Sequence, residues 1–352
     1  MAEDLGEFYR DCDPGIEGSF EIPKGYTSLC HGAFFENDEL EEIVFPSTLQ
    51  KIRDVAFMDC TALKEIILPD SITDLETDAF CGCESVKKLK ISNNLTIIRR
   101  GVFAGLGAKE IVIPDSVTSI SDFIPNEGDE SDDGDSWGGS GSFSGCAVQK
   151  LTLSKNLKLI GRDAFADCEN LTEVVIPDSV TKIDKSAFKN CKSLKKVILS
   201  KNLEEIGDEA FMGCSALKEL SIPDSVKVLG KQVFDKCPSL KLNKEYYERF
   251  MIAEARELAQ TNPFTALQIL YTAAMAGYYP AINELCTMLR TNDKIPNPNW
   301  PLNDDKFLTK VAELYKKGDT GPYEDVLFMY REHPKTKNPD REQEFLSKYI
   351  NK

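Results

Sequence analysis

Cysteine is the residue type whose spacing most suggests chemistry in this sequence. The 352 residues include 11 cysteines, and seven of them recur at one place in a repeated segment: Cys60, Cys83, Cys146, Cys168, Cys191, Cys214 and Cys237. Stacked strands lie about 4.8 Å apart, so neighbouring thiols would be close, but parallel side chains give poor disulfide geometry. No histidine lies near the column, which weakens metal binding as the alternative. We therefore expect reduced, buried thiols that act as small hydrophobes.

Other reactive residue types are thinly spread. The two histidines, His31 and His333, lie in no metal or catalytic-triad motif, and the sequence contains neither a phosphate-binding glycine loop nor a nucleophile elbow. In Cys81-Gly82-Cys83 the second thiol belongs to the repeated column, which leaves Cys81 as the only addition and argues against a redox pair. We expect no enzyme and no cofactor.

One acidic stretch resembles a calcium loop in part. Asp129, Asp133 and Asp135 are spaced somewhat like the ligands of an EF-hand. Ser140 stands where the bidentate glutamate is needed, and no helices are predicted on either side. A solvated loop explains this stretch better than a metal site, so we expect no bound metal.

The cysteine column belongs to a longer periodic pattern that must position it. Phenylalanines recur every 23 residues at Phe34, Phe57, Phe80 and Phe103, and again at Phe165, Phe188, Phe211 and Phe234, with Phe143 between the two runs. A fixed period of this size indicates a solenoid of stacked units. In the unit 63–83, apolar residues alternate up to Pro69, which ends a strand, and Phe80 then fills the centre of the coil.

The repeated pattern L-x-x-V-x-I-P-x-x-V-x-x-I-x-x-x-A-F-x-x-C resembles the BspA-like leucine-rich repeat family over about residues 20–242. The resemblance implies an α/β solenoid, a right-handed leucine-rich-repeat coil of 23-residue units with a parallel sheet on its concave face. It also implies a binding role, often at bacterial or protozoan cell surfaces. Pro-Asp-Ser coils alternate with Ser-Lys-Asn coils, as at 177–179 and 200–202, so the duplicated unit has the length of two coils.

Composition shifts divide the chain into three parts. Residues 1–19 are expected to form an N-terminal cap, with Leu5, Phe8 and Tyr9 on one face of a short helix. Residues 20–242 are the solenoid, in which the acidic Gly/Ser insertion 124–142 is expected to be flexible and to project from the side or the convex back. Residues 243–352 are an all-α domain, either a binding module or a cap for the open end of the solenoid; within it, 266–289 resembles a tetratricopeptide-like pair of the Sel-like kind.

Charge and hydropathy exclude several classes of partner. The net charge of 42 − 58 = −16 argues against a nucleic-acid partner, and no run of about 18 apolar residues predicts membrane insertion. The first residues, MAEDLGEFYR, lack the basic and apolar regions of a signal peptide. Together with many unpaired cysteines, this favours a cytoplasmic location; a surface or secreted protein whose signal peptide is absent from this chain is the alternative.

A binding surface is predicted from the alternation along each strand. The last outward position of successive strands is held by Val44, Ile67, Lys90, Val112, Thr152, Val175, Ile198 and Ser221. Five of the eight are Val or Ile, which reflects either β-propensity or an apolar stripe for a protein or peptide partner. Lysine patches at 87–90 and 195–196 flank the stripe.

The first hypothesis is therefore a non-enzymatic module that binds a protein or peptide through the concave sheet. The alternatives are a cell-surface adhesin and a scaffold that assembles through its helical tail. The sequence leaves the oligomeric state open.

Overall fold

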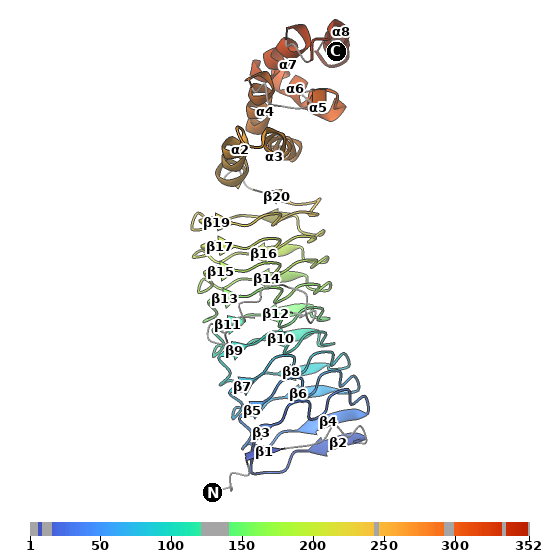
Figure 1. Ribbon diagram of the computed structural model, residues 1–352, viewed down its shortest axis with the longest axis vertical. Helices are drawn as coiled ribbons and strands as arrows, with labels where there is room; N and C mark the ends of the chain where they lie inside the picture. The colour runs from blue at the N-terminus through green and yellow to red at the C-terminus, as the bar shows by residue number, and fades with distance from the viewer. Residues whose placement is uncertain are drawn as a thin grey trace. The chain divides into compact units, whose positions relative to one another are not determined.

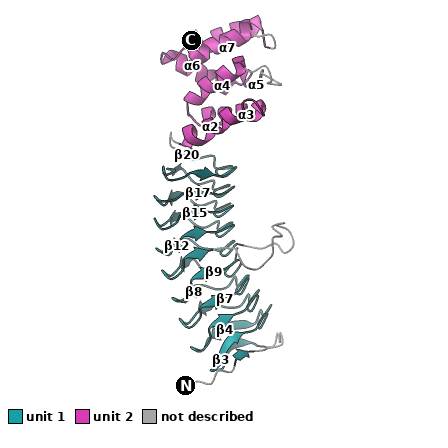
Figure 2. Ribbon diagram, turned by 60° about the vertical axis from the view of Figure 1, so that its left-hand side comes forward, with its two compact units in different colours: residues 1–241 teal, residues 242–352 magenta. Residues whose placement is uncertain are grey.

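The computed structural model describes residues 6–8, 16–120, 141–242, 246–291, 299–332 and 336–350. The chain divides into two compact units, Met1–Lys241 and Leu242–Lys352, which are coloured separately in Figure 2. Each unit has its own buried apolar core.

The first unit is a parallel β-solenoid, as the period predicts. Each coil contributes one strand to a long ladder and one to a short ladder, and every described pairing is parallel. The long-ladder strands are β2 (Gly18–Glu21), β4 (Leu40–Val44), β6 (Glu65–Ile67), β8 (Lys88–Lys90), β10 (Glu110–Val112), β12 (Lys150–Thr152), β14 (Glu173–Val175), β16 (Lys196–Ile198), β18 (Glu219–Leu220) and β20 (Lys241–Leu242).

The short ladder holds the odd-numbered strands, which stack on the other side of each coil in Figure 1. These strands are β1 (Gly6–Phe8), β3 (Tyr26–Leu29), β5 (Lys51–Ile52), β7 (Asp74–Leu75), β9 (Ile97–Ile98), β11 (Ser119–Ile120), β13 (Leu159–Ile160), β15 (Lys182–Ile183), β17 (Glu205–Ile206) and β19 (Val228–Leu229).

Turns that carry the phenylalanines form a third line of hydrogen bonds along the stack. In one coil the backbone N–H groups of Val55, Phe57 and Asp59 donate to carbonyls of the next coil at 3.1, 2.8 and 2.7 Å. The first and last of these donors have positive φ, 51° and 60°. Left-handed conformations are costly for residues with a Cβ, so the repeat mostly places glycine, aspartate or asparagine there.

Phenylalanine rings form a continuous stack through the solenoid core. Successive rings from Phe34 to Phe234 have centroids 4.9–6.0 Å apart and are tilted by 2–22°. Each fully buried ring stabilises the fold by about 1.5–3 kcal/mol. The stack therefore couples each coil to the next.

The column cysteines have a second role that the sequence did not reveal. Each thiol donates to the carbonyl oxygen of the phenylalanine one coil earlier, at 3.0–3.2 Å; Cys168 and Phe143 are one such pair, at 3.1 Å. The seven thiols are free and buried, as predicted. They thus fill space and also give a second hydrogen bond to a carbonyl that already accepts a backbone N–H, as the Phe143 carbonyl does from Cys146, and a methyl group could not add this bond.

The N-terminal helix prediction is wrong. Residues Gly6–Phe8 form strand β1, which pairs in parallel with β3, and the Phe8 ring packs against Tyr26 with centroids 4.9 Å apart. A strand is favoured here because the first coil presents unpaired backbone groups that a helix could not satisfy. Leu5 and Tyr9 lie outside the described residues.

The second unit is helical, as predicted. Its elements are η1 (Tyr247–Ile252), α2 (Ala253–Leu258), α3 (Pro263–Met275), α4 (Pro280–Thr291), α5 (Asn299–Leu302), α6 (Asp305–Lys316), α7 (Gly321–Arg331), α8 (Pro339–Phe345) and η2 (Leu346–Ile350). Asn262 caps α3 by accepting a hydrogen bond from the Thr265 N–H at 3.3 Å, and Pro263 occupies the first turn. Helix α4 packs against both α3 and α7.

Candidate partner-binding face

The eight predicted positions lie on the outer surface of the long ladder. Within each strand the preceding residue is turned inward: Val174, for example, is buried, whereas Val175 is exposed. Seven of the eight side chains are exposed, and Ile67 is half-buried. We call the outward residues of the long ladder the long-strand face.

Apolar side chains on this face form one stripe. Val44, Val112, Val175 and Ile198 are 49, 51, 57 and 45% exposed. Val175 and Ile198 are direct register partners on β14 and β16, so their side chains are neighbours. We call these four residues, together with Ile67, the apolar stripe. Lys90, Thr152 and Ser221 occupy the same position in the remaining coils.

The sequence did not single out three further exposed apolar side chains. Ile97 and Val228 lie on the short ladder, and Phe264 lies in α3. Four of the seven large exposed hydrophobic residues of the described chain therefore share one position of one ladder. Alternation within the two-residue strands would have revealed Ile97 and Val228, whereas Phe264 carries no periodic signal.

Residues of alternating charge flank the stripe at the outward position two residues before it in each strand. Glu65 pairs with Lys88 at 3.2 Å, and Glu110 pairs with Lys150 at 2.6 Å. Exposed ion pairs of this kind contribute only about 0–1 kcal/mol each, but they neutralise one another. The predicted lysine patch at 87–90 is therefore partly compensated through Lys88.

The short ladder has a different character. Lys51 bonds Glu76 at 2.5 Å and Asp74 at 3.2 Å, and Arg99 also bonds Asp74. Burial opposes ionisation of Asp74, but these two cations hold the pKa of its carboxyl below the usual range. Ion pairs thus occupy this surface, so it offers fewer free groups to a partner.

The cysteine thiols considered as candidates for chemistry are not activated as nucleophiles. Burial raises the pKa of the Cys81 thiol to about 11 and that of Cys60 to about 12, far from the thiolate needed for nucleophilic chemistry. His31 contacts Asp54 at 2.7 Å on an exposed turn. Within the described ranges no group of three or more His, Cys, Asp or Glu side chains is placed to hold a metal. The predicted calcium-like residues Asp129, Asp133, Asp135 and Ser140, and also His333, lie outside those ranges.

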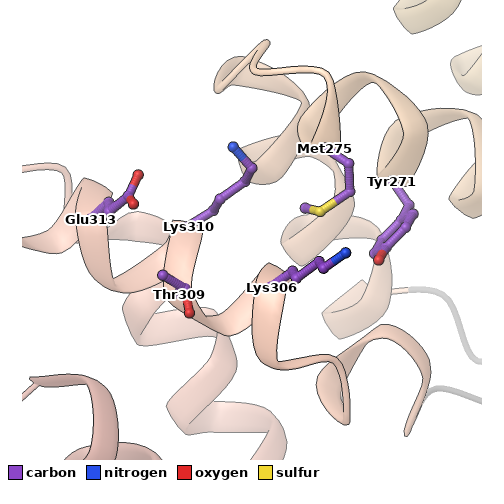
Figure 3. Close-up of a pocket in the computed structure, with 6 residues that line it drawn as sticks. All are labelled: Tyr271, Met275, Lys306, Thr309, Lys310 and Glu313. Atoms are coloured by element: carbon purple, nitrogen blue, oxygen red, sulfur yellow. The ribbon is translucent and has the colours of Figure 1, made fainter. Parts of the chain in front are cut away.

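The helical unit contains a cavity of about 440 Å³. Tyr271 and Met275 of α3 line one side, and Lys306, Thr309, Lys310 and Glu313 of α6 line the other (Figure 3). The Tyr271 hydroxyl donates a hydrogen bond to the Asp304 carboxylate at 2.6 Å. The lining mixes polar and apolar groups without a reactive centre.

Among the described helices, none is both long and apolar enough to cross a bilayer.

These features define a class: a leucine-rich-repeat solenoid joined to a helical unit. The chain belongs to the family described as BspA type leucine rich repeat region, whose model matches residues 8–124 and 139–243 in six copies. This family suggests a protein-interaction module. No curated protein matches the chain.

Several solved structures of bacterial leucine-rich-repeat proteins are similar to this chain. The pneumococcal vaccine antigen PcpA is 25% identical, covers 67% of this chain and is itself covered over 65% of its length, with a TM-score of 0.41. A leucine-rich repeat protein of Eubacterium ventriosum is 22% identical, with 68% of each chain covered and a TM-score of 0.47. A leucine rich cell surface protein of Faecalibacterium prausnitzii is 21% identical, with 64% of this chain and 72% of that chain covered and a TM-score of 0.38.

The expected cytoplasmic location gains no support from these comparisons. Its structural premise also weakens, because the column cysteines are explained by their bond to the neighbouring coil and by burial. Free thiols at these positions are explained by the repeat and do not indicate whether the protein resides in a reducing or an oxidising compartment.

Proposed function

We propose that this protein is a non-enzymatic interaction module that binds a protein or peptide across the long-strand face, the predicted concave sheet. The partner-binding residues are Val44, Ile67, Lys90, Val112, Thr152, Val175, Ile198 and Ser221. The observation that carries the proposal is the apolar stripe: four large hydrophobic side chains are about half exposed at one position of one ladder.

β-Propensity alone explains the stripe less well. The short ladder is built from the same kind of strand, yet Ile97 and Val228 are its two large exposed hydrophobic residues among those the structure describes, and ion pairs occupy the surface around Lys51 and Asp74. Apolar side chains exposed in a row, with polar groups beside them, are typical of interaction sites. A partner that covers the remaining exposed half of each Val or Ile would gain about 1 kcal/mol per side chain.

The test is selection of binders from a displayed peptide library on the full chain, followed by affinity measurement. We expect the double variant Val175→Thr, Ile198→Thr to bind the selected peptides about tenfold more weakly, from the burial lost at two side chains. Threonine keeps the β-branched shape, and Thr152 already occupies this position in one coil.

Matched control substitutions are available on the other ladder. Ile97→Thr with Val228→Thr removes the same chemical groups from exposed strand positions outside the face. Three results would contradict the proposal. The selected peptides could lose the same affinity in both double variants, they could bind Val175→Thr, Ile198→Thr as tightly as the unchanged chain, or the library could yield no binder.

Location at the cell surface is a separate proposal, which the family resemblance implies and the buried thiols do not oppose. Labelling of intact source cells with a membrane-impermeant amine reagent tests it. Labelling only after lysis would contradict it.

A further inference from the structure

A row of lysines runs along the long-strand face beside the apolar stripe. We call it the lysine column; its members are Lys64, Lys87, Lys109, Lys195, Lys218 and Lys241. Backbone bonds join neighbours directly: the Lys87 N–H donates to the Lys64 carbonyl at 2.9 Å, and the Lys241 N–H donates to the Lys218 carbonyl at 2.7 Å. Gln149 and Thr172 hold the same position in the coils between the two groups.

Most of the column has no acidic partner. Lys64 pairs with Glu41, but Lys87, Lys109, Lys195 and Lys218 are exposed and form no ion pair within the described part of the chain. Lys90, at the stripe position of its own coil, is also exposed and forms no ion pair within the described residues, although its charge acts on Asp70. The unpaired lysines of the column therefore form two groups, Lys87 with Lys109 and Lys195 with Lys218, and within each group the two residues lie about one strand spacing apart.

This face has the opposite charge to the rest of the chain. From β8 to β18 its outward residues carry eight lysines and three glutamates, a net charge of 8 − 3 = +5, on a chain of net charge −16. The lysines are Lys87, Lys88, Lys90, Lys109, Lys150, Lys195, Lys196 and Lys218, and the glutamates are Glu110, Glu173 and Glu219. A basic strip on an acidic protein attracts acidic ligands and orients them before contact.

We infer that the partner is an extended acidic polypeptide segment in which apolar side chains alternate with Asp or Glu. This inference rests on the proposed function. The stripe and the lysine column run in parallel along the stack, so a segment laid along them meets apolar and basic groups together. A nucleic acid fits less well, because Glu110, Glu173 and Glu219 would face its phosphates and the outward positions of these coils offer no aromatic ring for base stacking.

The test uses three labelled peptides of equal length, in which valine alternates with Glu, Gln or Lys, and a single-stranded oligothymidylate. Fluorescence polarisation with the full chain is expected to show tightest binding for the Glu peptide, weakening as salt is added. The double variant Lys87→Glu, Lys195→Glu should lower that affinity by about tenfold or more, since two attractions become repulsions.

The matched control has the same charge change on another surface. Lys158 and Lys185 are exposed and their ammonium groups form no ion pair within the described chain; Lys158 precedes the short-ladder strand β13. Lys158→Glu with Lys185→Glu should change affinity by less than about threefold, because screened charges away from the site act weakly. An equal loss in both double variants would overturn the inference.

The remaining outcomes separate this inference from the proposed function. The Gln peptide could bind as tightly as the Glu peptide, with binding lost in Val175→Thr, Ile198→Thr but kept in Lys87→Glu, Lys195→Glu. That result would overturn the inference of an acidic partner and leave the proposed interaction module intact. Oligothymidylate binding as tight as that of the Glu peptide, or no binding of the Glu peptide, would also overturn the inference. Failure of the library selection would refute the module itself.

Discussion

Val55 is the residue at which this repeat departs most clearly from its own backbone rule. It adopts φ = 51°, at a turn position that Gly32, Asp78 and Gly101 occupy in neighbouring coils. Its N–H donates to the Thr77 carbonyl at 3.1 Å, so the stacked coils hold the conformation in place. A β-branched residue is strained there, at a cost of about 1–2 kcal/mol.

Two polar substitutions isolate the backbone effect. Val55→Asn and Val55→Thr both remove apolar surface, but only threonine keeps the branched Cβ. Since asparagine is several-fold enriched in the left-handed region, we expect the Asn variant to be more stable than the Thr variant by about 1 kcal/mol. The difference corresponds to a shift of about 0.3–1 M in the urea midpoint.

The order should reverse at Val228, which is exposed in strand β19. There threonine is the better strand former, by up to about 1 kcal/mol. Urea unfolding followed by far-ultraviolet circular dichroism would be measured for all four variants. The same order at both positions, or a Thr variant at position 55 that matches or exceeds the Asn variant, would refute the reasoning.

Two further predictions concern the core columns. Burial raises the pKa of the Cys60 and Cys146 thiols to about 12, above their usual value near 9, so their contribution to the free energy of unfolding is complete below pH 9 and is lost as pH rises from 9 to 12. Above pH 9 each of these thiols lowers the free energy of unfolding by about 1.4 kcal/mol per pH unit. The urea midpoint should therefore fall sharply from pH 8 to pH 10, and a midpoint that does not change over this range would contradict the prediction. Phe165→Ala should cost about 3–5 kcal/mol in the same assay, since stacked rings lie 5.3 Å away on both sides. Phe234→Ala, at the half-buried end of the stack, should cost clearly less, and equal losses would count against the stack as the coupling element.

The solenoid could be predicted because the same spacing of apolar residues recurs in successive coils. The spacing from Phe57 to Phe80 fixes the register, and alternation within a strand then separates buried Val174 from exposed Val175. Strand β1 could not be predicted in this way, because Gly6–Phe8 pairs with an edge that exists only after the first coil has formed.

Other features depend on contacts between coils. The bond from the Cys168 thiol to the Phe143 carbonyl joins residues 25 positions apart, so local sequence carries no sign of it. The sequence showed lysine patches at 87–90 and 195–196, but their continuity as one column follows from the strand bounds, which place Lys87 and Lys109 directly before β8 and β10. Charge totals conceal it, because the chain as a whole is acidic.

Alternation between two kinds of coil has a structural cause that bears on function. The Asp178 carboxylate accepts the Lys201 N–H at 3.0 Å, and the Asp178 carbonyl accepts the Asn202 side-chain amide at 2.8 Å. The same two bonds join Asp115 to Lys155 and Asn156, and an equivalent set joins Asp70 to the next coil.

Three of the Pro-Asp-Ser coils, those of Asp70, Asp115 and Asp178, are thus bonded to the Ser-Asn-Asn or Ser-Lys-Asn coil after them, which agrees with a duplicated unit of two coils. These bonds lie just beyond the ends of the long-ladder strands and hold them in register without using the outward side chains. Val175 and Ile198 belong to one such pair of coils and are direct register partners. The fold therefore fixes where the outward side chains stand and leaves their identity free, so partner specificity can reside in the apolar stripe and the lysine column without cost to the solenoid.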